Sequence, residues 1–147
     1  MIDKVFVDTN VLVYTRDASE PQKQKQAMGW MSHLWSKRIG RLSFQVIQEY
    51  YATVTAKLEP GLAPDVARRD VRLLLSWQPI HIDARVLEGA WHLQDRHYLS
   101  WWDALIVSAA QVADCKYLLT EDLKEDQKLE NIRIINPFHI SPETLKR

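Results

Sequence analysis

Cysteine is nearly absent from this chain, which has Cys115 alone among its 147 residues. A single thiol cannot form an intramolecular disulfide, and it cannot supply the several thiolates of a cysteine-based zinc site. Free cysteine is among the residue types most often buried, so we expect Cys115 to be a small core side chain. A reducing cytoplasm suits such a thiol.

Long apolar runs are missing as well. No apolar stretch approaches the roughly 20 residues that a membrane-spanning helix needs, and the first residues lack the basic-then-apolar pattern of a signal peptide. We therefore expect a cytoplasmic protein without a membrane partner. With 46% hydrophobic and 26% charged residues the composition is that of an ordinary folded protein. The length predicts a single domain over residues 1–147.

Net charge is also lacking, because 19 Lys and Arg balance 19 Asp and Glu. The chain as a whole therefore has no general attraction for a polyanion, and any RNA binding requires a local basic patch. Two clusters near predicted helices are candidates: Lys37, Arg38 and Arg41, and Arg68, Arg69 and Arg72. Because such clusters are commonly solvated surface, the sequence does not decide between them.

Short β-branched and aromatic segments alternate with segments of helical periodicity. Strands are expected at residues 4–8, 41–43, 79–82, 116–119 and 132–135. Helices are expected at residues 21–38, 44–54, 65–75, 84–93 and 104–113, with Ser43, Asp83 and Ser100 at helix starts. This alternation predicts an α/β fold in which helices cover both faces of a parallel sheet.

Four acidic side chains end or interrupt apolar segments: Asp8, Glu49, Asp103 and Asp122. Asp8 and Asp122 follow predicted parallel strands, where open α/β sheets place their ligands, and Asp103 lies in the first turn of a helix. Carboxylates gathered there repel one another, and a divalent cation relieves the repulsion. Oxygen ligands without a Cys or His partner indicate Mg²⁺ or Mn²⁺ rather than zinc. Such a metal supports phosphodiester hydrolysis.

Each acid also has a structural interpretation. Asp8 and Asn10 could cap a helix, Ser100 with Asp103 resembles a capping box, and Asp122 could occupy a polar turn. The remaining acid, Glu49, could face solvent on its helix. The sequence also leaves open which acid near the end of the 116–119 strand completes a site, because three others lie close to Asp122: Glu121, Glu125 and Asp126.

Four segments, taken in order, carry a resemblance to a known family. They are residues 5–12 (VFVDTNVL), 45–51 (QVIQEYY), 102–106 (WDALI) and 118–123 (LLTEDL). Each is weak alone, but the ordered set is specific and spans nearly the whole chain. It resembles the PIN-domain ribonucleases of the VapC toxin type.

The resemblance implies a three-layer α/β/α sandwich with a central, mainly parallel sheet. It implies that Asp8, Glu49 and Asp103 are the principal metal-binding and catalytic acids and that Asp122 matches a more variable fourth. Supporting polar positions would be Thr9 or Asn10, and Thr120. The implied activity is that of a Mg²⁺- or Mn²⁺-dependent endoribonuclease that cleaves single-stranded RNA or RNA loops. The implied partners are a second copy of the chain and a cognate antitoxin.

Two other functions stay open at this stage. A metal-dependent phosphatase would use Asp8 as its nucleophile, but such a site normally has a second acid where Asn10 stands. A non-enzymatic acidic interaction or phosphoacceptor domain would need a lysine near the last strands, for which Lys116 and Lys124 are candidates.

Aromatic side chains predict a partner surface. The stretch at residues 27–35, with Trp30 and Trp35, is apolar over a wider arc than one buried helix stripe needs, which predicts a dimer or antitoxin surface around these tryptophans. Trp101 and Trp102 are adjacent, so they cannot both face the same side of a helix. One of them is expected to reach the surface.

Overall fold

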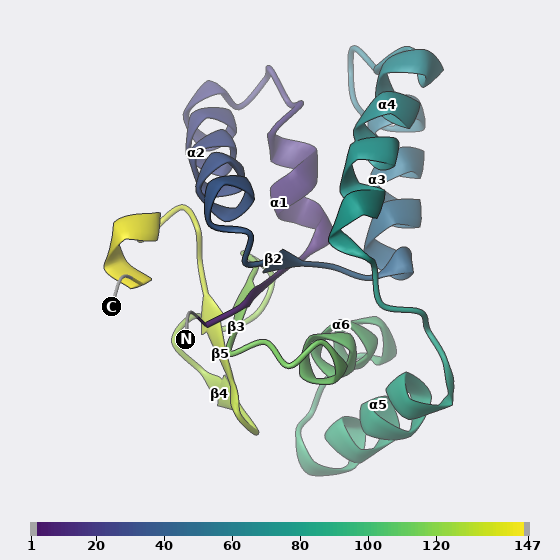
Figure 1. The fold of residues 1–147 in the computed structure, drawn as a ribbon, viewed down its shortest axis with the longest axis vertical. Helices are drawn as coiled ribbons and strands as arrows, with labels where there is room; N and C mark the ends of the chain where they lie inside the picture. The colour runs from purple at the N-terminus through teal and green to yellow at the C-terminus, as the bar shows by residue number, and fades with distance from the viewer. Residues whose placement is uncertain (1–2, 146–147) are drawn as a thin grey trace.

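The computed structural model describes residues 3–145 and is built on a five-stranded sheet of order β2-β1-β3-β5-β4. The strands are β1 (Val5–Val7), β2 (Gly40–Arg41), β3 (Tyr117–Leu119), β4 (Lys128–Leu129) and β5 (Ile132–Ile135). All neighbouring pairs are parallel except β4 with β5. Figure 1 shows the sheet between two groups of helices, α1 to α4 above it and α5 and α6 at the lower right. The predicted fold, a mainly parallel sheet flanked by helices, is confirmed.

The helices are α1 (Thr9–Tyr14), α2 (Pro21–Lys37), α3 (Phe44–Ala56), α4 (Pro64–Leu74), α5 (Ala84–Arg96) and α6 (Trp101–Val112), with the 3₁₀ turns η1 (Leu75–Trp77) and η2 (Pro142–Leu145). The three predicted N-caps are confirmed. The side chains of Ser43, Asp83 and Ser100 each accept a hydrogen bond from the backbone N–H three residues later. In the part of the chain from Asp3 to Leu145, no helix is both long and apolar enough to cross a bilayer.

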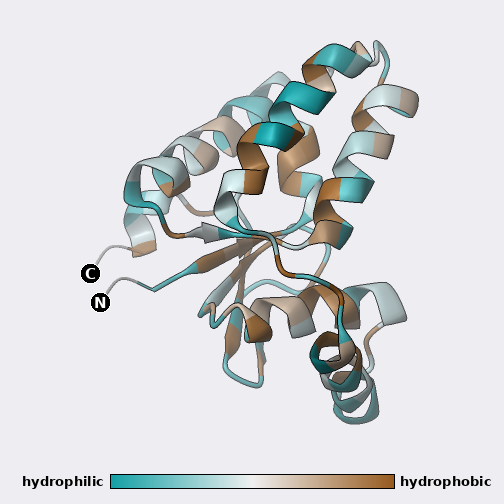
Figure 2. Cartoon of the chain, turned by 45° about the vertical axis from the view of Figure 1, so that its right-hand side comes forward, coloured by the Kyte–Doolittle hydropathy of each residue, from teal (hydrophilic) through white to brown (hydrophobic). Residues whose placement is uncertain are grey.

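The central strands are apolar on both faces because helices cover both. All three residues of β1 are buried, as are Leu118 and Leu119 of β3, and Figure 2 shows these strands as a brown, hydrophobic centre. Cys115, just before β3, is 3% exposed, which confirms its expected place in the core.

The expected strand at residues 79–82 is wrong. The segment makes one isolated parallel bridge, between Ile80 and Ser43, and no ladder. Ile80 donates to the Leu42 carbonyl at 2.9 Å and accepts from the Phe44 N–H at 3.0 Å. Pairing stops there because Pro79 has no N–H to give and Asp83 already caps α5.

Two short elements were not predicted. Helix α1 has six residues rich in β-branched side chains, and it forms because Asp8 caps it and Val11 and Leu12 are buried against the core. Strand β4 has two residues inside a stretch of charges that predicted only a connection. It forms because Glu130, in the left-handed conformation at φ 57°, turns the chain back onto β5.

Candidate functional site

The candidate site begins where β1 and β3 end side by side. Val7 pairs with Leu119, and the Asp8 N–H donates to the Leu119 carbonyl at 3.0 Å. Asp8 and Thr120 therefore leave the sheet at the same edge, where the Thr120 hydroxyl donates to Asp8 Oδ2 at 2.9 Å. The parallel register brings together residues 112 positions apart. This edge lies at the carboxyl ends of the strands, where α/β folds place ligands.

Asp8 is a buried carboxylate, with 7% of its surface exposed. Its Oδ1 accepts from the Thr9 N–H at 2.7 Å, so it also caps α1, as its structural interpretation predicted. Burial raises the pKa of the Asp8 carboxyl from 3.8 to about 7; hydrogen bonds from Thr120 and Thr9 oppose this shift, and the charges of Asp122 and Glu49 add to it. A helix cap alone does not need such a costly position.

Asn10 links two of the acids. Its amide nitrogen lies 3.1 Å from Asp122 Oδ2, 3.1 Å from the Thr120 hydroxyl and 3.3 Å from Asp8 Oδ2. Its amide oxygen accepts from the Glu121 N–H at 3.3 Å, so both ends of the side chain are engaged. Asn10 thus holds the carboxylates that follow β1 and β3 next to each other.

Glu49 reaches the same place from α3. The Thr9 hydroxyl donates to Glu49 Oε1 at 2.7 Å, which connects this carboxylate to the start of α1. Gln45, one helical turn earlier, donates its amide to Glu49 Oε2 at 3.3 Å. The half-buried Glu49 is therefore held from two sides by hydrogen bonds.

Gln45 is a site residue that the sequence analysis missed. It is 8% exposed, and its Oε1 is a buried oxygen that has no hydrogen-bond partner within residues 3–145. The available signal was its spacing of four residues from Glu49, which places both on one face of a helix. A buried acceptor without a donor is costly and commonly marks a position completed by a water or a ligand.

Asp103 approaches from the opposite side of the sheet. It lies in the first turn of α6, where its N–H donates to the Ser100 hydroxyl at 3.1 Å. The pKa of Asp122 is raised, and burial is the largest cause. The Asn10 hydrogen bond opposes this shift, while the charges of Glu121 and Asp103 increase it. Asp103 is therefore close enough for its charge to reach Asp122.

The other acids near Asp122 have partners elsewhere. Glu121 accepts from the Tyr14 hydroxyl at 2.7 Å and pairs with Lys23 at 2.9 Å. Of the two remaining acids, Asp126 pairs with Arg133 at 3.6 Å and Glu125 contacts the His139 ring. Of these four acids, Asp122 is the one whose carboxylate accepts a hydrogen bond from Asn10, as the Asp8 carboxylate does.

Chemically, these side chains fit a hard divalent cation. The donors are all carboxylate oxygens, and their charges are of one sign. In the positions seen here, no three His, Cys, Asp or Glu side chains of residues 3–145 converge closely enough to hold a metal ion. The donor set therefore matches in kind and charge, and closing around an ion would require its side chains to move inward.

The two neighbouring tryptophans face different surroundings, as predicted. Trp101 is half-buried and stacks on Trp91 of α5, with ring centroids 6.4 Å apart. Trp102, next to Asp103, is 61% exposed.

Comparison with known proteins gives a family and a fold. Residues 5–131 match the family described as PIN domain. Similar solved structures include a toxin–antitoxin complex from Klebsiella pneumoniae, with 17% identity, a TM-score of 0.63 and coverage of 93% of this chain and 100% of that one. FitAcB from Neisseria gonorrhoeae is 18% identical with a TM-score of 0.68, covering 92% of this chain and 99% of that one.

A third similar structure is VapBC2 from Rickettsia felis bound to a DNA fragment from their promoter. It is 18% identical with a TM-score of 0.59, and the match covers 91% of this chain and 97% of that one. At these identities the likeness shows a shared fold. No curated protein matches the chain.

Proposed function

The chain belongs to the PIN-domain family, and we propose that it is a divalent-metal-dependent endoribonuclease that hydrolyses phosphodiester bonds in single-stranded RNA or RNA loops. One observation carries the proposal: Asp8 is buried beside Asp122 and Glu49 at the carboxyl edge of the sheet, where burial and their charges hold its pKa near 7. A cation that binds there would be stabilised by every one of these carboxylates.

The residues that would hold Mg²⁺ or Mn²⁺ are Asp8, Glu49, Asp103 and Asp122. Once bound, the ion supplies a Lewis acid that orients phosphate oxygens and lowers the pKa of a water. The surrounding side chains keep the carboxylates in place: Thr9 and Gln45 hold Glu49, while Asn10 and Thr120 hold Asp8. Such supporting hydrogen bonds typically change metal affinity or activity by about 10- to 100-fold when removed.

The phosphatase alternative has less support. Oδ1 of Asp8 accepts from Thr9 and Oδ2 accepts from Thr120 and Asn10, so the carboxylate is held in one orientation. The residue two positions later is an amide that donates hydrogen bonds rather than an acid. This arrangement favours Asp8 as a fixed metal ligand.

Cleavage of RNA is expected to depend on the metal. A labelled single-stranded RNA incubated with the protein should be cut when Mg²⁺ or Mn²⁺ is added and left intact in chelator, because the carboxylates alone repel a phosphate. Adding back excess Mg²⁺ to the chelated sample should restore cutting. Undiminished cleavage after thorough chelation would show that the metal proposal is wrong.

We also propose that the chain is the toxin of a toxin–antitoxin pair, acting as a homodimer in the cytoplasm. Similar solved structures are toxin–antitoxin complexes. An apolar groove of about 350 Å³ between α2 and α4 suits a protein partner. Three exposed apolar side chains border it: Met28, Trp35 and Leu73, which are 53%, 39% and 58% exposed.

One part of the predicted partner surface is corrected. Trp30 is 1% exposed, and its indole N–H points to the carbonyls of Pro137 and Ile140, each at 3.1 Å. It packs in the core because α2 is covered on that side by the chain that follows β5. Trp35 is thus the tryptophan of this stretch available to a partner.

Copurification with the product of the adjacent gene should give a complex that cleaves RNA more slowly than the free chain, with an arginine of the partner reaching the acids. Trp35→Ala should weaken the complex by about 2 kcal/mol or more, as loss of an aromatic anchor does, without slowing cleavage by the free chain. Trp91→Ala is the matched control, because Trp91 is 48% exposed on the other side of the sheet. A fully active complex would exclude the toxin role and leave the nuclease proposal standing.

A further inference from the structure

A basic groove between α3 and α4 lies beside the carboxylate cluster. Its lining residues are Ile47, Gln48, Tyr51, Arg68, Val71 and Arg72, and its volume is about 440 Å³. We infer that this groove binds the substrate strand, with an unpaired base against Tyr51 and flanking phosphates on Arg68 and Arg72. The inference rests on the proposed ribonuclease function and assigns a substrate-binding surface to it.

The neutral charge of the chain makes such a surface necessary, and the topology decides between the two basic clusters. Lys37 and Arg38 precede β2, which runs parallel to β1, so they lie at the opposite end of the sheet from Asp8. Arg41 donates to the carbonyls of Gly40 and Arg38, at 2.8 and 3.4 Å. The cluster on α4 is the one that lies next to α3, the helix that carries Glu49.

Helix α3 connects the groove to the candidate site. Gln45 and Glu49 face the carboxylate cluster, while Gln48 and Tyr51 face the groove. Gln48 and Glu49 are consecutive, and a helix with its side chains is about 10 Å across. A single strand crossing α3 can therefore contact both surfaces at once.

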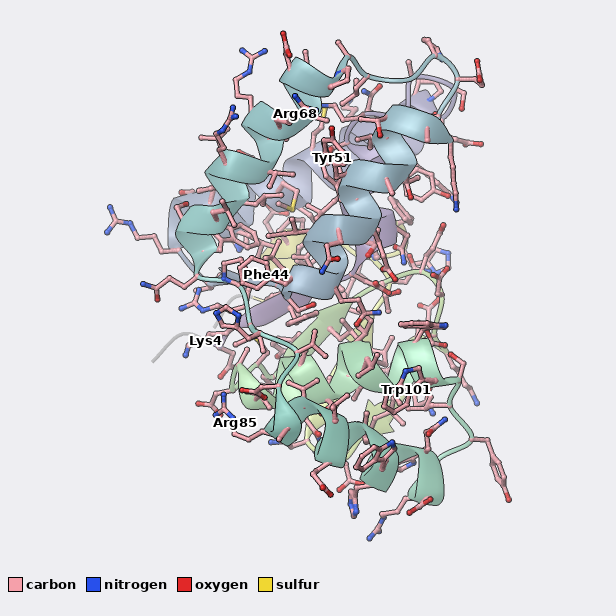
Figure 3. The ribbon with its side chains drawn as sticks, turned by 90° about the vertical axis from the view of Figure 1, so that its right-hand side faces the viewer. Lys4, Phe44, Tyr51, Arg68, Arg85 and Trp101 are labelled. Carbon is pink, nitrogen blue, oxygen red and sulfur yellow. The ribbon has the colours of Figure 1, made fainter. Side chains whose placement is uncertain are left out.

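The side chains in the groove have the chemistry of a site for a base and phosphates. Ile47 and Val71 supply apolar contact. The half-buried Tyr51 ring, with the Arg68 guanidinium 6.0 Å from its centroid, supplies an aromatic surface against which a base can stack. Figure 3 shows Arg68 on α4 close to Tyr51 on α3. Arg68 Nε donates to the Tyr51 hydroxyl at 3.1 Å, which fixes the guanidinium and leaves its other N–H groups for phosphate.

Helix α4 carries two acids, and neither lines the groove: Asp65 is exposed in the first turn. Asp70 is turned inward, where Arg16 donates to it at 2.7 and 2.9 Å and Tyr50 adds a further hydrogen bond. This acid is thereby neutralised away from the groove. Arg68, Arg69 and Arg72 stay exposed on the outer side, so the groove presents a positive surface to a polyanion.

The test is RNA binding by the full chain in chelator, which separates binding from cleavage. A fluorescent single-stranded RNA is titrated at several salt concentrations with the parent, Arg72→Ala and the Arg68→Ala/Arg72→Ala double variant. Each arginine lost should weaken binding about tenfold at low salt. The double variant should flatten the slope of log affinity against log salt by about 1.4, since each phosphate contact on a single strand contributes about 0.7.

Lys37→Ala is the matched control. Lys37 and Arg72 both lie exposed in the last turn of a helix, and Lys37 is at the far end of the sheet, so this variant should bind RNA like the parent. Tyr51→Leu should weaken the binding of single-stranded RNA by roughly 5- to 150-fold. It should leave the weaker binding of duplex RNA unchanged. Thermal unfolding checks that the variants are folded.

The results separate the two proposals. Weaker binding by the α4 variants supports the groove even if no cleavage is found. Parent-like binding by the double variant, equal losses in Lys37→Ala, or no RNA binding by the parent at low salt would each overturn the groove. If the double variant binds RNA like the parent but cleavage still requires metal, the ribonuclease proposal remains intact. An acidic protein segment as the true occupant would also give parent-like RNA binding.

Discussion

Asp8→Asn is expected to reduce metal-dependent RNA cleavage at least about 100-fold while the protein stays folded. The amide keeps the shape of the side chain and removes a charge that would hold the cation, and a bound metal supplies several kcal/mol of transition-state stabilisation. Glu49→Gln and Asp103→Asn should have similar effects for the same reason. Cleavage by each variant is compared with the parent at saturating Mg²⁺.

The acids near Asp122 provide controls for this series. Asp122→Asn should slow cleavage, because its carboxylate shares Asn10 with Asp8. Glu121→Gln and Asp126→Asn make the same chemical change on acids that pair with Lys23 and Arg133, and they should cleave like the parent. If Asp8→Asn, Glu49→Gln and Asp103→Asn all cleaved at the parent rate, the site assignment would be wrong.

Asp8→Asn is also expected to remove a destabilisation of the metal-free protein that reaches about 4 kcal/mol at pH 8, less the cost of the hydrogen bonds that the new NH2 group cannot accept. The pKa of Asp8 is raised to about 7 in the folded protein, from an ordinary value of 3.8. Below about pH 4 both states hold the proton, so the carboxyl costs the fold nothing. Between pH 4 and 7 the unfolded chain ionises first, and the parent loses stability as the pH rises. Above about pH 7 the loss is complete.

Urea unfolding in chelator at pH values from 4 to 8 measures this effect. The free energies of unfolding of the parent and Asp8→Asn should diverge as the pH rises, with the variant ahead at pH 8. Asp126→Asn, which removes an exposed acid, should follow the parent profile. Parallel profiles for parent and Asp8→Asn would mean that burial of this carboxyl does not destabilise the fold.

Much of the candidate site was predictable because its acids follow local patterns. Asp8 follows a buried strand, and Asp103 follows the helix start at Ser100, features that a few neighbouring residues determine. The contacts that join the acids were not predictable, since they depend on residues far apart in the sequence. Thr9 meets Glu49 across 40 positions, and Asn10 meets Asp122 across 112. The catalytic and metal-binding roles of these acids stay predictions.

The buried amide of Gln45 shows the same division. Its spacing of four residues from Glu49 was visible in the sequence. The burial of Gln45, which makes a hydrogen bond between the two side chains important, depends on the tertiary structure. The resemblance indicated Asp122 as the fourth acid, but the sequence left open whether Glu121, Glu125 or Asp126 completes the site instead. The structure separates them, because the carboxylate of Asp122 contacts Asn10 while those of Glu121, Asp126 and Glu125 contact Lys23, Arg133 and His139 respectively.

The sequence by itself determined the alternation of strands and helices and the helix starts at Ser43, Asp83 and Ser100, because periodicity and capping act over a few residues. Tertiary structure decided the elements too short to be stable alone. Helix α1 is stabilised by the burial of Val11 and Leu12, and β4 is stabilised by pairing with β5. Residues 79–82 form a single β-bridge and no strand. It also decided which basic cluster lies near the acids, because only the parallel pairing of β1 and β2 sets Lys37 at the far end of the sheet.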